Sequence, residues 1–155
     1  MNIRERISQE TKDAMKAHDE LRVSVFRMLS SAMHNRVLEK RAKSGVESEL
    51  SEGEGVAAIR SELKKRMDAI VAFRNGGRDE AADTEEREAE ILRAFLPPEL
   101  SDEDLLKLVE EGKIATGATR EADAGKLTGW VIQRIGGQAS GDRVMTIAKK
   151  TLGTT

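Results

Sequence analysis

The chain has 155 residues, of which 35% are charged and 3% aromatic, and it contains no cysteine. This length suits one domain, or one domain with a small appendage, and allows a buried core without disulfides or metals. The lack of cysteine excludes disulfides, cysteine-based zinc sites and thiol nucleophiles, and it fits a reducing compartment. The N-terminus is charged and no apolar run approaches the length of a membrane helix, so we predict a cytoplasmic protein with no membrane segment.

The composition predicts an all-α fold, because Ala, Leu, Glu, Lys and Arg lose little side-chain freedom in a helix. The net charge of −2 is unevenly spread. Residues 18–43 carry six basic and three acidic side chains, whereas residues 79–104 carry eleven acidic and two basic ones. Such blocks can steer charged partners, but solvated helix faces are the simpler explanation.

Apolar residues recur at helical spacing through the first half of the chain and predict four helices. Their predicted ranges are 3–17, 19–43, 56–74 and 78–96. A break is expected at His18, a loop over 44–55 where three glycines stand, and a glycine end to the third helix at Gly76. Helices with one apolar face can bury it only against one another, so we expect an elongated helical hairpin or bundle.

Two consecutive prolines, Pro97 and Pro98, predict the domain boundary, because neither can donate a helical hydrogen bond. Residues 1–97 are predicted to form the N-terminal helical domain and residues 98–155 a compact C-terminal three-helix domain. The helices of the small domain are predicted at 102–115, 120–135 and 140–152. Trp130 is expected to anchor the core of this domain, facing Leu105, Val109 and Ile147.

No residue pattern of a catalytic or metal site is present. The two histidines, His18 and His34, lack the spacing of metal ligands and are expected to lie exposed on helices. Residues 125–129 resemble part of a phosphate loop, but the full motif and the strand that precedes it are missing. We therefore expect no catalytic residue, no metal and no cofactor, and a function in binding.

Basic side chains of the second and third helices suggest a surface for phosphates. On the third helix these are Arg60, Lys64, Lys65 and Arg66. Because almost no aromatic residues lie among the cations, any nucleic acid would be bound through shape and phosphates rather than through its bases.

Short motifs run along the whole chain in a definite order. In the second half they are Thr116-Gly117-Ala118, Asp123, Gly125-Lys126, Gly129, Gly137, Ala139, Val144, Lys149-Lys150 and Leu152. In the first half they are Arg27-Met28-Leu29, Asn35-Arg36, Ala72-Phe73, Gly77-Arg78, Ala82-Asp83, Glu90-Ile91-Leu92 and Leu96-Pro97-Pro98-Glu99-Leu100-Ser101. In order and spacing these motifs resemble the YqeY family of GatB/YqeY-domain proteins.

The resemblance implies a relation to the C-terminal tail of the GatB polypeptide of the glutamine-dependent Asp/Glu-tRNA amidotransferase. In that enzyme, amide transfer takes place in a cradle domain that this chain lacks, and the tail and the helices before it contact tRNA. The resemblance thus implies a noncatalytic accessory protein that binds tRNA or a tRNA-charging complex. Carbon–nitrogen ligase activity with glutamine as amide donor is implied by family association alone. The alternative is a protein–protein adaptor that uses an exposed helical face and the acidic segment 79–90.

Eight basic residues are candidate contacts to tRNA phosphates. They are Lys126, Arg134, Arg143, Lys149 and Lys150 in the small domain, and Arg22, Arg27 and Arg36 on the long second helix. The chain departs from the family pattern at Gly136 and Gln138, where relatives usually carry Lys or Arg. Residues 101–155 hold eight basic and eight acidic side chains, so the small domain has no net attraction for a polyanion.

The three motif glycines each have an expected role. Gly125 stands near a helix N-terminus, where backbone N–H groups can hold a phosphate. Gly129 lies inside the same helix, and close packing against another helix is the simpler explanation for it than close approach of a ligand. Gly137 belongs to the tight turn that leads into the last helix.

Overall fold

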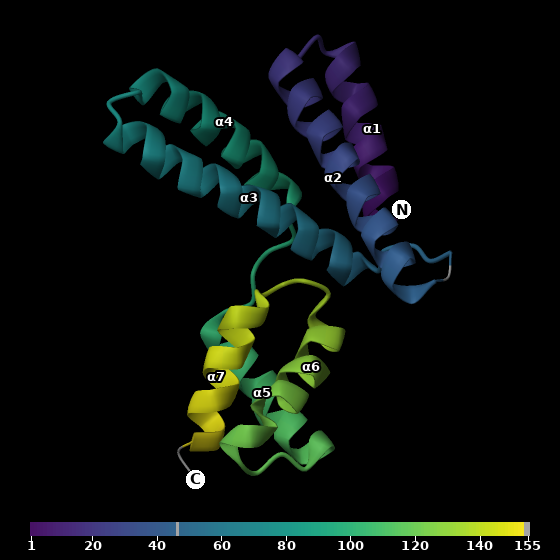
Figure 1. Ribbon diagram of the computed structural model, residues 1–155, viewed down its shortest axis with the longest axis vertical. Helices are drawn as coiled ribbons and strands as arrows, with labels where there is room; N and C mark the ends of the chain where they lie inside the picture. The colour runs from purple at the N-terminus through teal and green to yellow at the C-terminus, as the bar shows by residue number, and fades with distance from the viewer. Residues whose placement is uncertain (46, 154–155) are drawn as a thin grey trace. The chain divides into compact units, whose positions relative to one another are not determined.

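The structure, a computed structural model, describes residues 1–45 and 47–153, and over this part it is all-α without a strand. The all-α class predicted from the sequence is thus confirmed. Residue 46 of the predicted loop and the last two residues of the predicted small domain lie outside the described part. The chain divides into two compact units, unit 1 (Met1–Leu96) and unit 2 (Pro97–Thr155) (Figure 1). No helix in the described ranges is both long and apolar enough to span a membrane.

Unit 1 is built from two pairs of neighbouring helices, visible in Figure 1. The helices are α1 (Ile3–Lys16), α2 (Glu20–Ser44), α3 (Glu52–Asn75) and α4 (Asp79–Phe95). Capping boxes start α1 at Asn2 and α3 at Ser51, where side chains satisfy the first backbone N–H groups. Gly45 ends α2 in the left-handed conformation, with φ 66°.

The third helix begins earlier than predicted. The glycines of segment 44–55 indicate a loop, yet α3 already starts at Glu52 and Gly55 lies buried within it. Two features override the low helix propensity of glycine. The capping box of Ser51 and Glu54 stabilises the first turn, and a Cβ on Gly55 would lie only 2.5 Å from the Cγ2 of Ile3. Gly55 is therefore a packing residue.

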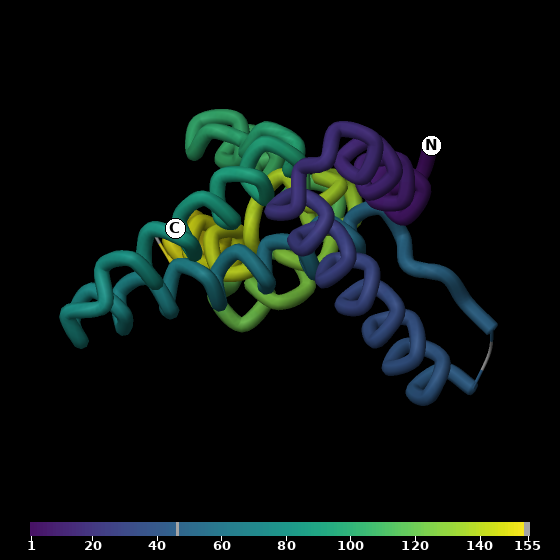
Figure 2. The backbone as a smooth tube through the Cα atoms, turned by 90° about the horizontal axis from the view of Figure 1, so that it is seen from above, coloured from purple at the N-terminus to yellow at the C-terminus, as the bar shows by residue number. Residues whose placement is uncertain are grey.

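The end of α2 holds the segment that precedes α3. Figure 2 shows α2 extending beyond α1 before the chain turns back toward α3. The Arg41 guanidinium lies 2.9 Å from the Glu49 carboxylate, and the Lys40 ammonium lies 2.7 Å from that of Glu54. The hydrogen bond from Lys40, followed by that from the Ser51 backbone N–H, keeps the pKa of Glu54 below its ordinary value.

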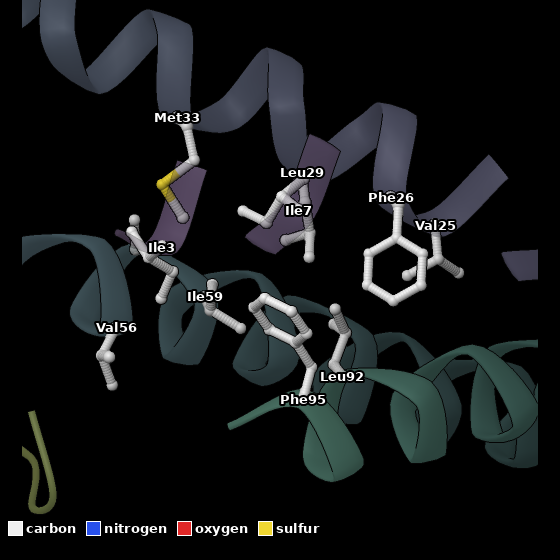
Figure 3. Packing of buried hydrophobic residues seen from close by; sticks show 11 residues of the cluster. Ile3, Ile7, Val25, Phe26, Leu29, Met33, Val56, Ile59, Leu92 and Phe95 are labelled. Carbon is white, nitrogen blue, oxygen red and sulfur yellow. The ribbon is translucent and has the colours of Figure 1, made fainter. Parts of the chain in front are cut away.

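All four helices contribute to the core of unit 1 (Figure 3). Phe26 of α2 and Phe95 of α4 meet edge to face, with ring centroids 5.6 Å apart. The other labelled side chains of this core are Ile3, Ile7, Val25, Leu29, Met33, Val56, Ile59 and Leu92. This shared core joins the α1–α2 pair to the α3–α4 pair.

Unit 2 contains α5 (Asp102–Thr116), the 3-10 helix η1 (Glu121–Asp123), α6 (Ala124–Ile135) and α7 (Gly141–Gly153). The α-helices bury a second cluster made of Leu105, Val109, Ala118, Ala124, Leu127, Val131, Ile135, Ala139, Val144, Ala148 and Leu152. The helix predicted from residue 120 becomes α-helical only at Ala124. The preceding turn is held by Asp123, whose carboxylate accepts the N–H groups of Thr119 and Arg120, each at 3.1 Å.

Trp130 lies at the edge of this second core and is only half-buried. Its ring packs over Gly112 of α5, where an added Cβ would lie 2.8 Å from the Trp130 Cε3 and 2.7 Å from the Leu127 Cδ1. On the outer side, the Arg134 guanidinium stacks 3.7 Å from the ring centroid. Trp130 therefore covers the contact between α5 and α6 at Gly112, which we call the seam between these helices.

Candidate functional site

The candidate cations on α2 are used unequally. Arg22 pairs with Glu10 of α1 and lies over the Phe26 ring at 5.7 Å, so it joins the first two helices. Arg36 forms an exposed pair with Glu39 one turn away, at 3.5 Å. Arg27 is exposed and borders a shallow hollow at the α1–α2 turn. Of the three, Arg27 has its charge most open to a partner.

Arg143 of α7 has a structural role. Its guanidinium donates to the Leu100 carbonyl at 3.0 Å and reaches the carboxylates of Asp102 at 2.6 Å and Glu99 at 3.4 Å. These contacts fix the segment that leads into α5 against α7. Because Arg143 is already surrounded by two carboxylates, it is a poor phosphate contact.

The two candidate cations of α6 also make local contacts. The Lys126 ammonium donates to the Thr116 carbonyl at 2.9 Å, which satisfies a free acceptor at the C-terminus of α5. Arg134 donates to the Trp130 carbonyl at 2.9 Å while it stacks on that ring. Both side chains are nevertheless exposed and extend to the surface of unit 2.

The adjacent cations of α7, Lys149 and Lys150, are exposed. Successive positions on an α-helix point about 100° apart, so the two ammonium groups diverge. Lys150 borders a groove between α5 and α7. The five candidates of unit 2 therefore do not converge on a single phosphate site.

The outer face of α6 corrects the expectation for Gly129. The sequence favours close helix packing at this position, but Gly129 is exposed and a Cβ on it would meet nothing within 4 Å. Gly125, one turn earlier, is equally open. The glycine on which a neighbouring helix does pack is Gly112, which sequence reasoning missed. We call the exposed surface around Gly125 and Gly129 the open face of α6.

The turn from α6 to α7 needs its glycines for conformational reasons. Gly136 and Gly137 both adopt the left-handed region, with φ 54° and 81°. The following carbonyl, of Gln138, accepts the Leu100 N–H at 2.8 Å and ties this turn to the start of unit 2. The motif glycine Gly137 is thus explained by the backbone, without a ligand.

The acidic segment 79–90 is largely neutralised within unit 1. Arg66 of α3, whose side chain is 11% exposed, pairs with Glu85 at 3.0 Å and with Glu88. Farther along α3, Arg74 pairs with Asp83 at 3.1 Å and with Glu86 at 2.8 Å. The basic residues of α3 are thus in part structural rather than available to phosphates. The carboxylates of the acidic segment are largely paired, although Asp83 and Glu86 remain 61% and 47% exposed.

The sequence analysis did not predict that two apolar residues of α5 are exposed. Leu106 and Ile114 are 44% and 87% exposed, whereas Leu105, Val109 and Gly112 are buried. Their exposure could have been predicted. The helical spacing that buries Leu105, Val109 and Gly112 places Leu106 and Ile114 on another face of the helix. His18 and His34 are both exposed, and the described residues hold no group of three His, Asp or Glu placed to bind a metal.

A separate comparison with family models supports the family resemblance. A family model described as Yqey-like protein matches residues 4–152, nearly the whole chain. Among curated proteins, nothing matches the chain. Because the model spans both units, the chain belongs to the YqeY-like protein family.

Proposed function

We propose that this protein is a noncatalytic, cytoplasmic accessory protein that binds tRNA, or a tRNA-charging complex, through the open face of α6. One observation carries the proposal. Gly129 lies inside a helix, where glycine costs about 0.5–1 kcal/mol relative to alanine, yet nothing in the described chain packs against it. A partner whose backbone comes close to the helix accounts for glycine at this position.

The charges beside the open face suit a sugar–phosphate backbone. Side-chain neighbours place α7 antiparallel to α6, because Thr128 lies against Met145 and Gly141 lies against Ile132. The N-terminal end of α6, with Lys126, is therefore near the C-terminal end of α7, with Lys149. A nucleic acid bound here would rest on the exposed glycine surface of α6 near these lysines.

The proposed relation to the tail of the GatB polypeptide of the amidotransferase supports the same partner. In that enzyme, the tail faces tRNA and the chemistry takes place elsewhere. The proposed role of this chain is to hold or orient tRNA for another protein, and we propose no ligase activity for the chain alone.

Titration of bulk tRNA with the full chain at two salt concentrations tests the proposal. Binding that weakens steeply with salt is expected, because each neutralised phosphate contributes roughly 0.7–0.9 to the slope of log affinity against log salt. The variant Gly129→Gln should weaken binding, because its side chain covers the open face. The matched control Ala115→Gln, at an exposed position of α5, should bind like the wild type. Lack of tRNA binding even at low salt would rule out tRNA itself as the partner.

A protein–protein adaptor is the second candidate function, and the exposed apolar side chains of α5 favour it. The acidic segment 79–90 does not, because its carboxylates are largely paired with arginines of α3. A chain that binds no tRNA at low salt and yet forms a stable complex with a purified protein partner would support this candidate over the first.

A further inference from the structure

Helix α5 leaves an apolar row on its outer side. Leu106 and Ile114 are separated by Glu110, so the three residues follow one another at intervals of four and share a face over about two turns. Ile114 is 87% exposed, well above the 40–58% of the internal apolar residues exposed in unit 1. Single exposed apolar residues are common, but this row adjoins a groove and is therefore a candidate docking surface.

The groove lies between α5 and α7 and has a volume of about 370 Å³. Its lining residues are Asp102, Leu106, Glu110, Ile147, Lys150 and Thr151. Leu106 and half-buried Ile147 supply its apolar surface, one from each helix. The groove and the row that ends at Ile114 together form what we call the α5 surface.

The charge around the α5 surface is acidic. Residues 102–113 contain five acids against two lysines, Lys107 and Lys113, a local net charge of −3. Asp102, Asp104 and Glu110 pair with Arg143, Lys107 and Lys113 at 2.6, 3.8 and 3.7 Å, and the acidic charge of this face comes from the exposed Glu103 and Glu111. Lys150 is the single cation among the residues that line the groove. An apolar strip bordered by carboxylates favours a basic protein segment and disfavours a polyanion.

We propose that the α5 surface docks a short basic amphipathic helix of a protein partner. Apolar residues of that helix at intervals of three or four would contact Leu106, Ile147 and Ile114, and its flanking Lys or Arg would face Glu110 and its acidic neighbours. The distance from Leu106 to Ile114 along α5 is roughly 12 Å, which two to three turns of a partner helix can cover. The proposal goes beyond tRNA binding at the open face of α6 and does not depend on it.

A labelled synthetic peptide of about 14 residues, long enough for roughly four helical turns, can serve as the probe. Leucines at helical intervals of four form one face, and lysines occupy the flanks. The full chain should bind this peptide more weakly as salt rises. A peptide of the same composition with scrambled leucines should bind at least about tenfold more weakly, and so should one with glutamates in place of the lysines.

Two pairs of protein variants locate the binding. Ile114→Glu should weaken peptide binding at least about tenfold, whereas Val71→Glu, the same kind of change at an exposed residue of α3, should leave it unchanged. Glu110→Lys should weaken binding and flatten its salt dependence, whereas Glu80→Lys on α4 should do neither. Unchanged Trp130 emission and helical circular dichroism show that each variant is folded.

Three results would overturn the proposal. The first is equal binding of the lysine and glutamate peptides, and the second is equal binding by the Ile114→Glu and Val71→Glu variants. The third assigns the α5 surface to another occupant. If Ile114→Glu abolishes tRNA binding, the surface belongs to RNA, and if it dissolves a self-associated form of the chain, the surface belongs to a second copy.

Discussion

The seam between α5 and α6 and the open face of α6 each have a glycine inside a helix, but the surroundings of the two glycines are opposite. A Cβ on Gly112 would lie within 3 Å of side-chain atoms of Leu127 and Trp130, whereas a Cβ on Gly129 would meet nothing within 4 Å. Packing inside unit 2 explains the first glycine. No contact within the described chain explains the second, and the proposal of a partner at the open face of α6 rests on this difference.

A similar contrast separates cations that are held by carboxylates from cations that are exposed. In unit 1, Arg66 and Arg74 of α3 are held by carboxylates of α4 and contribute to the fold. In unit 2, Lys149 and Lys150 are exposed on α7. A basic residue in a sequence therefore indicates a phosphate site only after its internal acidic neighbours are known.

The largest effect is expected from Gly112→Val, which should lower the free energy of unfolding of unit 2 by about 1–3 kcal/mol. The added side chain must displace Leu127 or the Trp130 ring, because the available space is less than a van der Waals contact. Urea unfolding followed through Trp130 fluorescence measures the change. Ala115→Val, at an exposed position of the same helix, controls for the helix propensity of valine. Equal stability of the two variants would show that Leu127 and Trp130 do not pack tightly against Gly112.

Gly55→Ala tests whether unit 1 also has two helices that pack closely at a glycine. The new Cβ would lie 2.5 Å from the Ile3 Cγ2. We therefore expect a loss of about 1–2 kcal/mol despite the better helix propensity of alanine. In an Ile3→Ala background, which removes the clashing methyl group, Gly55→Ala should instead be stabilising. Chemical unfolding followed by circular dichroism measures all four proteins, and a loss of the same size in both backgrounds would place the cost elsewhere.

Gly129→Ala should act in the opposite direction and stabilise unit 2 by about 0.5–1 kcal/mol, because it improves helix propensity without meeting a neighbour. Thermal unfolding measures the gain, and Ala115→Gly on α5 should show a loss of similar size. A protein that becomes more stable and yet binds tRNA less well would support a functional reason for the glycine. Destabilisation by Gly129→Ala would show that the open face is packed.

The helices could be predicted because the signals that define them are local. Apolar spacing identifies each of them, and Pro97 stops α4. The predicted start of α3 is wrong, because a glycine such as Gly55 locally indicates a loop. In the fold, the missing side chain of Gly55 makes room for Ile3, which lies more than fifty positions earlier in the sequence.

The candidate site was harder to predict, because exposure depends on how each helix is rotated in the fold. Gly112 and Gly129 both lie inside predicted helices, and only tertiary packing shows which of them contacts a neighbouring helix. Arg143 is a candidate phosphate contact in the sequence, because its carboxylate partners lie 41 and 44 residues away. Nothing in its own segment reveals these pairs.

The smallest effect is expected at Asp123, which holds the turn that starts α6. Its carboxylate accepts the N–H groups of Thr119 and Arg120, and these hydrogen bonds keep its pKa below the ordinary value of about 3.9. A carboxyl group whose pKa is lower in the folded state stabilises the fold above its unfolded pKa, and this stabilisation is lost as pH falls through the folded pKa.

Asp123→Asn should therefore slightly lower the unfolding temperature of unit 2 at neutral pH, since a neutral amide accepts these hydrogen bonds more weakly than a carboxylate. The difference from the wild type should shrink as pH falls below the ordinary pKa of aspartate and through the lowered pKa of the folded Asp123 carboxyl group. Melting curves followed by Trp130 fluorescence at several pH values measure it, with Asp142→Asn in the first turn of α7 as the control for loss of one charge. A constant difference at all pH values would mean that Asp123 acts through its shape rather than its charge.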